Sequence, residues 1–301
     1  MEIAITLTAA PQSQDLFLDT AAAIQRELHG ALEFSWLAEG EAADLMFRDG
    51  INGLDGSQLP ALRKAVASAV GVQPADWCVQ PVQGRRKRML IADMDSTIIG
   101  QECLDEMADL KGIKPEIASL TERAMRGDLD FEAALRERIR LLRGLTEADL
   151  QRVLDESITL NPGARTLVQT MKSHGAHTVL VSGGFTFFTS AVAARAGFAV
   201  NRANVFLWEG GHLSGVAEPI LGKEAKLAAL KEEAAAHGIG ASDAIAVGDG
   251  ANDLAMLKEA GLGIAYRAKP VVAAEAEAQV RHTDLTALLY FQGYTRDGFR
   301  G

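Results

Sequence analysis

Cysteine, aromatic residues and basic charge are scarce in this 301-residue chain, and each shortage excludes a class of protein. Two cysteines, Cys78 and Cys103, are too few for a disulfide framework or a cysteine-rich metal site. Three tryptophans and three tyrosines give no hint of an aromatic platform for nucleic-acid bases. The net charge of −10 also argues against a nucleic-acid partner, which would require a basic face.

Long apolar runs and secretion signals are missing as well. No apolar run approaches the roughly 20 residues that span a membrane. The N-terminal residues lack the basic segment and apolar stretch that together mark a secretion signal. With 48% hydrophobic and 23% charged residues, the composition is that of an ordinary globular protein. We therefore expect a soluble, cytoplasmic protein without a membrane partner.

Residues 1–83 are predicted to form a small domain of their own. Strand-like alternation and helical apolar spacing follow one another there in the order β-α-β-β-α-β. This is the order of the split βαβ arrangement of ferredoxin-like folds. The predicted strands are 2–8, 31–37, 43–47 and 77–82, and the predicted helices are 16–28 and 59–70. The basic run Arg85–Arg88 that follows is predicted to be a solvated linker.

Residues 89–301 are predicted to form an α/β domain. Strand and helix signals alternate there, which indicates a mostly parallel, Rossmann-like sheet covered on both faces. The apolar strand candidates are 89–92, 178–181, 244–247 and 262–265. A charge-rich helical insert, about 101–160, springs from the loop after the first of these strands. We expect this insert to cover the site as a cap.

Polar clusters follow three of these strands directly. Open α/β sheets build their sites beyond the carboxyl ends of the strands, so the clusters are expected to meet. They are Asp93-Met94-Asp95-Ser96-Thr97, Ser182-Gly183-Gly184 and Gly248-Asp249-Gly250-Ala251-Asn252-Asp253. In an extended segment, residues two apart point the same way, about 7 Å apart at ~3.3 Å per residue. One carboxylate of the first cluster can therefore act as a nucleophile while the other handles protons.

This set of residues suits phosphoryl transfer. Mg²⁺ prefers hard oxygen ligands, which the carboxylates of Asp93 and Asp249 and the backbone carbonyl of Asp95 can supply. The metal and Lys223 would neutralise the phosphoryl oxygens. Asp93 would attack phosphorus and form an aspartyl phosphate. Asp95 would protonate the departing alkoxide and then activate water.

The clusters resemble those of the haloacid-dehalogenase-like phosphatases, and the likeness extends over about residues 89–289. Within that family, the chain is similar to the members that hydrolyse O-phosphoserine to serine and phosphate in serine biosynthesis. The stretches that carry this closer likeness are Asp93–Cys103, Glu122–Phe131, Leu135–Arg138, Ser182–Phe188 and Gly263–Pro270. The resemblance implies a parallel core sheet with a helical cap and a bound Mg²⁺.

The resemblance also implies residue roles that spacing alone does not give. Glu102 would hold the substrate ammonium and Arg138 its carboxylate, for which a planar guanidinium is well suited. The other implied roles are an apolar lid from Met125 and Phe131, phosphate binding by Ser182, Gly183 and Lys223, and support of the metal and the lysine by Asn252 and Asp253. Lys226 lies one helical turn beyond Lys223, so the two lysines can be confused when this role is assigned.

Three alternatives stay open at this point. A related enzyme would use phosphothreonine, phosphohomoserine or another small phosphate ester. A signalling protein would hold an aspartyl phosphate as a switch, although receiver-type proteins lack the second carboxylate that Asp95 supplies. Residues 1–83 resemble amino-acid-binding ACT domains in their element order, which implies serine sensing or homodimer formation, and a purely structural or association module is the alternative.

Overall fold

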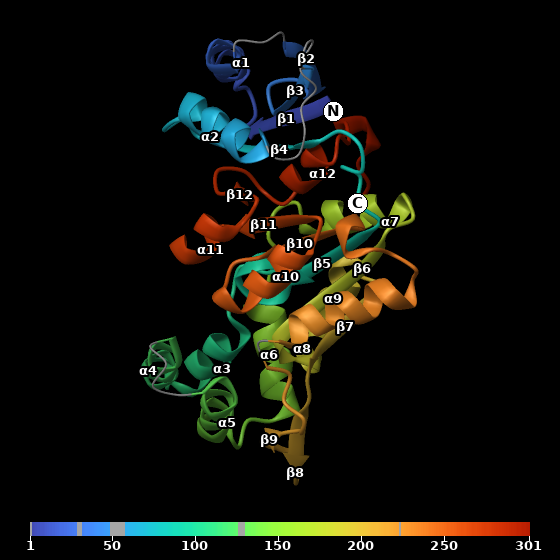
Figure 1. Ribbon diagram of the computed structural model, residues 1–301. Coiled ribbons are helices and arrows are strands. Elements are labelled where there is room, and N and C mark those ends of the chain that lie inside the picture. The colour runs from blue at the N-terminus through green and yellow to red at the C-terminus, as the bar shows by residue number, and fades with distance from the viewer. Residues whose placement is uncertain (1, 29–31, 49–57, 126–129, 223) are drawn as a thin grey trace.

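The computed structural model describes residues 2–28, 32–48, 58–125, 130–222 and 224–301 (Figure 1). The N-terminal elements form an α+β unit at one end of the molecule, with four antiparallel strands. Their order is the predicted β-α-β-β-α-β. The elements are β1 Glu2–Ala9, α1 Gln14–Leu28, β2 Leu32–Ala38, β3 Ala42–Arg48, α2 Leu59–Val70 and β4 Ala75–Pro81. The likeness of this unit to an ACT domain stays a prediction.

The N-terminal unit has its own hydrophobic core. Phe17 of α1 and Val66 of α2 are fully buried against Ile5 of β1. Almost every residue of β1 is nevertheless buried, on both faces of the strand. The reason is that the C-terminal helix α12, Ala287–Phe291, packs against β1 as well.

The centre of the molecule is a sheet of six parallel strands in the order β12-β11-β10-β5-β6-β7. This arrangement confirms the predicted parallel α/β core. The strands are β5 Met89–Asp93, β6 His177–Phe185, β7 Val200–Asn204, β10 Ala244–Gly248, β11 Leu262–Tyr266 and β12 Ala278–Val280. β5 lies between β10 and β6, so its carboxyl end lies in the middle of the sheet edge that carries the predicted site.

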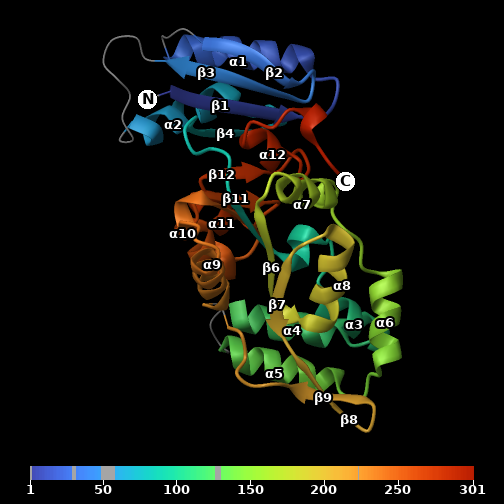
Figure 2. The ribbon, with the colours of Figure 1, turned by 90° about the vertical axis from the view of Figure 1, so that its right-hand side faces the viewer.

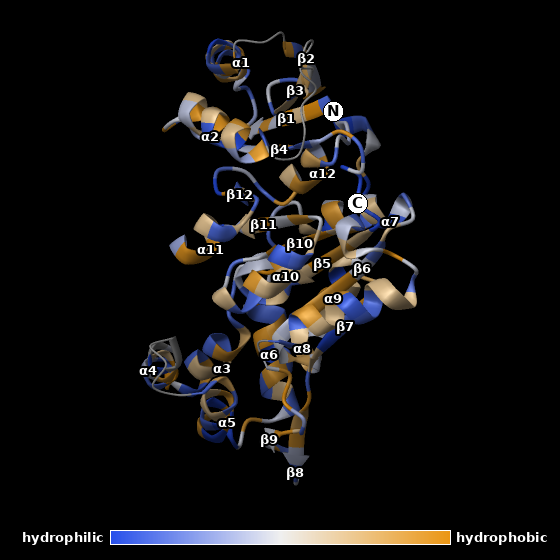
Figure 3. Ribbon diagram, viewed as in Figure 1, coloured by the Kyte–Doolittle hydropathy of each residue, from blue (hydrophilic) through white to orange (hydrophobic). Residues whose placement is uncertain are grey.

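Helices cover both faces of this sheet (Figure 2). They are α7 Ala164–Ser173, α8 Thr186–Ala196, α9 Ala225–Ala236, α10 Leu254–Glu259 and α11 Pro270–Glu275. Met89 and Ile91 of β5 pack in one cluster with α9, α10 and α11, whereas Leu90 and Ala92 pack in another with α7, α8 and α12. Burial on both faces explains why β5, β10 and β11 read as apolar runs rather than as alternating patterns (Figure 3).

In the described part of the chain, α-helices α3 to α7 stand between β5 and β6, and the first four of them lie beyond the carboxyl end of the sheet (Figure 2). These four are α3 Cys103–Lys111, α4 Lys114–Met125, α5 Phe131–Leu142 and α6 Glu147–Glu156. A separate hairpin of β8 Phe206–Glu209 and β9 His212–Val216 packs against α5. No helix in the described part of the chain is long and apolar enough to cross a membrane.

The N-terminal strands and the central strands form one continuous sheet. β4 joins β12 in antiparallel orientation through Trp77 and Gln279. Beside this junction, the buried carboxylate of Asp76 accepts hydrogen bonds from the backbone N–H groups of residues 281–283 at 2.8–3.2 Å. These hydrogen bonds satisfy the buried carboxylate. They also link β4 to the segment that follows β12, and so hold the two parts of the sheet together.

Within the basic run Arg85–Arg88, which the sequence predicts to be a solvated linker, Arg86 and Arg88 are exposed, but Arg85 is not. Arg85 is only 9% exposed, and its Nη2 lies 2.6 Å from Asp44 Oδ2 of the N-terminal unit. The Arg86 guanidinium lies 4.4 Å from the ring centroid of Tyr294. These cations are held by partners far away in the sequence, which explains why the local pattern misleads.

Candidate active site

The site begins at the carboxyl end of β5, where Asp93 is only 5% exposed. Its Oδ1 accepts a hydrogen bond of 2.8 Å from the backbone N–H of Met94. The chain then turns through residues 94–98, with Asp95 in extended conformation and Ser96 at φ +55°. This turn brings Asp95 back beside Asp93 and starts the segment that leads into the cap.

A lysine and two carboxylates form a buried ion-pair network at the centre of the site. Lys226 Nζ lies 2.6 Å from Asp93 Oδ1 and 2.6 Å from Asp253 Oδ1. The other oxygen of Asp253 accepts a hydrogen bond of 3.0 Å from the N–H of Gly250. Glycine is required at position 248, because a Cβ there would lie 2.4 Å from Asp253 Cγ. Asp253 therefore braces both Lys226 and the loop after β10.

Burial and mutual repulsion shape the electrostatics of these groups. Burial, with the charge of Asp253, raises the pKa of Asp93, against the opposing effect of Lys226. Burial and Asp253 also raise the pKa of Asp249. Burial alone would lower the pKa of Lys226, but the carboxylates of Asp253 and Asp93 outweigh it and the pKa is raised. One lysine does not compensate three carboxylates, so negative charge remains.

A divalent cation fits this excess of negative charge. Carboxylate oxygens of Asp93, Asp249 and Asp253 lie within 4.8 Å of one another. Both oxygens of Asp253 already accept hydrogen bonds, from Lys226 and Gly250, which leaves Asp93 and Asp249 as the more available ligands. Oxygen donors of this kind suit hard cations. The donor set therefore agrees with the predicted metal site.

The carboxylate of Asp95 is held from two sides. Its Oδ1 accepts a hydrogen bond of 2.9 Å from the N–H of Cys103, the first residue of α3. Its Oδ2 accepts one of 2.9 Å from the hydroxyl of Ser182, which is 2% exposed. The same hydroxyl accepts a bond of 2.8 Å from the N–H of Gly184. Asp95 and Ser182, predicted to share the site, are thus in direct contact.

The cap reaches the C-terminal part of β6 through Phe131, at the start of α5. A Cβ placed on Gly183 would lie 3.3 Å from the Phe131 ring, so glycine allows the ring to approach the β6 backbone closely. Arg138 lies seven residues further along α5, two turns away and so on about the same side of the helix. α5 therefore brings both predicted cap residues toward the site.

Two charged groups of opposite sign meet the site from the cap side. The hydroxyl of Ser96 donates a 2.6 Å hydrogen bond to Glu102 Oε1. Surrounding protein and the carboxylates of Asp95 and Asp249 raise the pKa of Glu102 to about 7, although Ser96 opposes this. Burial lowers the pKa of Arg138, against the nearby carboxylates of Glu102, Asp105 and Asp95. An arginine and a glutamate so placed can receive the two ends of an amino acid.

Not every predicted residue can be placed. Lys223 and the side chain of Met125 lie outside the described residues. Within the described residues, the lysine that reaches Asp93 is Lys226, whereas the sequence resemblance gives the role of phosphate-binding lysine to Lys223. One signal could have identified it, because Lys226 lies at helical spacing with the buried residues Leu230 and Ala234 of α9.

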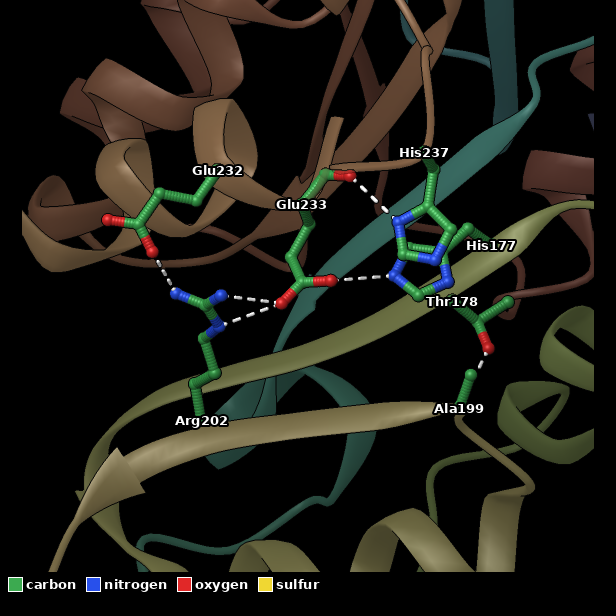
Figure 4. A network of polar contacts seen from close by, with 7 residues as sticks. All are labelled: His177, Thr178, Ala199, Arg202, Glu232, Glu233 and His237. Atoms are coloured by element: carbon green, nitrogen blue, oxygen red, sulfur yellow. Dashed lines mark hydrogen bonds and ion pairs between the residues drawn. The ribbon is translucent and has the colours of Figure 1, made fainter. Parts of the chain in front are cut away.

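A second polar cluster holds the far end of α9 (Figure 4). His177 Nε2 lies 2.8 Å from Glu233 Oε2, and Arg202 donates to Glu233 Oε1 at 2.9 and 2.6 Å. The rings of His177 and His237 stack with centroids 3.6 Å apart. These histidines and Glu233 offer ligand atoms within 4.8 Å of one another, but both Glu233 oxygens already have partners and the rings lie face to face. The cluster is therefore a clamp between α9 and strands β6 and β7.

Sequence comparison agrees with the geometry of the site. The profile of the haloacid dehalogenase-like hydrolases matches residues 90–258, more than half of the chain. The phosphoserine phosphatase of Albidiferax ferrireducens is 45% identical over 208 residues. This alignment covers 67% of the present chain and 88% of that protein.

Solved structures extend the likeness to the N-terminal unit. A HAD-family hydrolase from Salmonella enterica serovar Typhi superposes with a TM-score of 0.81 at 31% identity, covering 97% of this chain and 98% of that chain. A probable phosphoserine phosphatase from Vibrio cholerae gives a TM-score of 0.75 at 26% identity, covering 98% of this chain and 88% of that one. The N-terminal unit and the central sheet are thus found together in other structures.

Proposed function

Because the chain belongs to the haloacid dehalogenase-like hydrolase family, we propose that it is a Mg²⁺-dependent phosphatase that hydrolyses O-phosphoserine to serine and phosphate. The reaction would serve serine biosynthesis in the cytoplasm. The observation that carries the proposal is that two different groups of residues meet at one site. A buried acidic and basic network lies at the strand ends, and an arginine and a glutamate approach it from the cap.

In the first step, a carboxylate oxygen of Asp93 attacks phosphorus while the bond from phosphorus to the serine oxygen breaks. Asp95 gives its proton to that oxygen, because an alkoxide is a poor leaving group. Lys226 and Ser182 stand where they can stabilise the phosphoryl oxygens. Bound Mg²⁺, held by Asp93, Asp249 and the Asp95 carbonyl, would supply further positive charge.

In the second step, water hydrolyses the aspartyl phosphate. The carboxylate of Asp95, now without its proton, takes one from the attacking water. The new bond joins the water oxygen to phosphorus, and the bond from phosphorus to Asp93 breaks. Phosphate leaves, Asp93 is a carboxylate again and Asp95 is protonated again. Lys226 Nζ lies 2.6 Å from Asp93 and can stabilise the carboxylate as its bond to phosphorus breaks.

Glu102 and Arg138 would select the amino acid. The carboxylate of Glu102 would bind the substrate ammonium, and the guanidinium of Arg138 would bind the substrate carboxylate with two hydrogen bonds. Phe131 and Met125 would close the site above the phosphate-binding residues Ser182 and Gly183. Support for this part of the proposal comes from the close approach of Phe131 to Gly183, which brings α5 against the C-terminal part of β6.

A substrate panel tests the proposal directly. Purified protein is given phosphoserine, phosphothreonine and phosphohomoserine, with and without Mg²⁺, and phosphate release is measured. We expect phosphoserine to have the highest kcat/KM, with activity lost on chelation. Asp93→Asn is expected to lower turnover by about 10⁴-fold or more, as for other enzymes that lose their nucleophile. If phosphoserine is the poorest of these substrates, the proposal is wrong.

Asp95→Asn separates an enzyme from an aspartyl-phosphate switch. A hydrolase needs the acid–base carboxylate, so phosphate release should fall by about 10²–10⁴-fold. Unchanged release would contradict the role of Asp95.

Residues 1–83 are proposed as a domain that senses serine or forms a homodimer. Serine titration by calorimetry and sedimentation of the full chain test this, and no serine binding outside the active site together with a monomer would contradict it.

A further inference from the structure

Asn204, the last residue of β7, links the C-terminal part of β6 to the segment that leads to α9. It is only 3% exposed, and both polar atoms of its side chain have partners. Its Nδ2 donates a hydrogen bond of 2.9 Å to the carbonyl oxygen of Gly183. Its Oδ1 accepts one of 2.7 Å from the N–H of Leu221, in the segment that leads to α9.

Asn204 takes the place of a strand partner for Gly183. β6 and β7 pair in register up to Val181 and Arg202, and pairing resumes at Phe185 and Asn204. Three residues of β6, numbers 182–184, therefore bulge opposite the single residue 203 of β7. Such a bulge leaves backbone groups without ladder partners. The Asn204 amide supplies the missing donor for one of them.

The contact with Gly183 fixes the orientation of a whole peptide group. The carbonyl of Gly183 and the N–H of Gly184 belong to one planar unit, so a bond that holds one end also orients the other. The Gly184 N–H donates to the Ser182 hydroxyl at 2.8 Å, and this hydroxyl donates to Asp95 Oδ2 at 2.9 Å. A continuous series of hydrogen bonds thus runs from Asn204 to the carboxylate of Asp95.

We propose that Asn204 is a positioning residue for proton transfer by Asp95, acting through the Gly183–Gly184 peptide and the hydroxyl of Ser182. The inference rests on the proposed phosphatase function. Asn204 itself does not touch the acid–base carboxylate. It holds the peptide whose N–H fixes the Ser182 hydroxyl, and the hydroxyl aims its proton at Asp95. Without it the bulge is free to rotate, and Asp95 loses one of the two contacts that orient it.

Asn204→Asp isolates this contact from the one with Leu221. A carboxylate keeps an oxygen for the Leu221 N–H but has no proton to give to the Gly183 carbonyl. Asn204→Ala removes both contacts and is the second variant. Asn201→Ala is the matched control, because Asn201 lies on the same strand and accepts hydrogen bonds from Thr189 and Ser190, away from the site.

The measurement compares two leaving groups on the same enzyme sample. The serine oxygen needs a proton as it departs, whereas p-nitrophenolate leaves without one, and kcat/KM reports only the steps up to the aspartyl phosphate. We expect Asn204→Asp and Asn204→Ala to lower kcat/KM at least about tenfold more for phosphoserine than for p-nitrophenyl phosphate, since general acid catalysis alone contributes 10²–10⁴-fold. The ratio does not depend on the folded fraction of the sample. Asn201→Ala should leave it unchanged.

A double-mutant cycle with Ser182→Ala gives a second readout on phosphoserine alone. If Asn204 acts through Ser182, replacing Asn204 in the Ser182→Ala background should cost little more. Additive losses, or equal losses on both substrates, would overturn the inference. A wild-type protein that does not hydrolyse phosphoserine would instead refute the proposed function, so the two failures are distinguishable.

Discussion

The two halves of the site are built differently. In the strand-end half, Asp93, Asp253 and Lys226 are at most 5% exposed, and Lys226 lies 2.6 Å from each of the two carboxylates. In the cap half, Glu102 is exposed and Arg138 is half-buried. Buried polar groups must be hydrogen-bonded within the protein, so the first half carries its partners with it. The cap half retains charges for the substrate to satisfy.

This difference assigns the two tasks of the enzyme to different parts of the chain. Groups that are rigid and desolvated before the substrate arrives stabilise developing charge without reorganising, which favours the chemical steps. Groups on a cap that covers the site are suited to recognition and closure. Changes to Asp93, Asp253 or Lys226 should therefore affect every phosphate ester, whereas changes that disturb Asp95 should affect esters whose leaving group needs a proton more than those whose leaving group does not. Changes in the cap half should affect phosphoserine alone.

Lys226→Met should give the largest effect, on both activity and stability. Methionine leaves the buried carboxylates of Asp93 and Asp253 without their cation, and breaking a buried pair costs about 3–5 kcal/mol. Urea unfolding in the absence of metal measures this loss. Turnover of phosphoserine and of p-nitrophenyl phosphate should fall together, by about 10²-fold or more, as when a charge-stabilising donor is removed.

Lys231→Met on the same helix is the control for this variant. Lys231 is exposed, and its ion pair with Glu259 spans 3.5 Å, so its loss should change the free energy of unfolding by less than about 0.5 kcal/mol. Equal effects of the two variants would mean that the strand-end half is not the preorganised part of the site.

Arg138→Ala should affect phosphoserine selectively. Hydrogen bonds to a charged partner contribute about 1.5–3 kcal/mol, so KM for phosphoserine should rise about tenfold to a hundredfold. KM for p-nitrophenyl phosphate, which has no carboxylate, should not change. Arg140→Ala is the control, because Arg140 is exposed and pairs with Glu137 on the same helix at 2.7 Å. A parallel rise for both substrates would show that the cap half does not select the amino acid.

The strand-end half was largely predictable from the sequence, because its residues are contiguous with buried strands. Asp93 ends β5, Ser182 lies near the end of β6 and Asp249 follows β10, so the rule that sites form at carboxyl ends was sufficient. Lys226 was harder. Lys223 and Lys226 are one helical turn apart, and only the helical spacing of Lys226 with Leu230 and Ala234 places Lys226 on the buried face of α9.

Contacts between distant segments could not be predicted at all. Arg85 has the local signature of a solvated basic run, yet Asp44, 41 residues earlier, pairs with it in a buried position. Asn204 reads as an ordinary polar strand end, and only the bulge in β6 gives it a role at Gly183. Both depend on register and packing between elements, which neither periodicity nor motif spacing encodes.

The pH dependence of substrate binding should distinguish the cap half further, with a smaller effect. The pKa of Glu102 is raised to about 7, so below this pH the carboxyl is neutral and cannot pair with an ammonium group. The kcat/KM for phosphoserine should therefore rise with pH through this pKa, about tenfold over one unit below it. A cation bound near Asp95 and Asp249 would lower the pKa of Glu102, so kcat/KM would then rise at a lower pH. Glu102→Gln should remove it.

The stability consequence of the same group has the opposite sign. The folded protein binds more protons at Glu102 than the unfolded chain between the ordinary value of 4.5 and about 7. Its contribution to folding is therefore favourable at low pH and declines as pH rises through that window. Glu102→Gln should flatten this decline in a series of unfolding measurements without metal. A decline that persists in the variant would assign the titration to another group.

Glu233→Gln should have the smallest effect on turnover. This variant tests whether the strand-end half of the site depends on the C-terminal end of α9, where Glu233 lies. Burial would raise the pKa of Glu233, but hydrogen bonds from His177 and Arg202 outweigh it and the pKa is lowered. Its stabilisation is therefore present above the unfolded pKa near 4.5 and is lost as pH falls through the lower folded value. At pH 8 we expect a loss of about 1–3 kcal/mol, against about 0.5 or less for the exposed Glu232→Gln. Since Lys226 keeps its own carboxylates, kcat well below the melting temperature should not change, and a fall in kcat would show that the clamp positions Lys226.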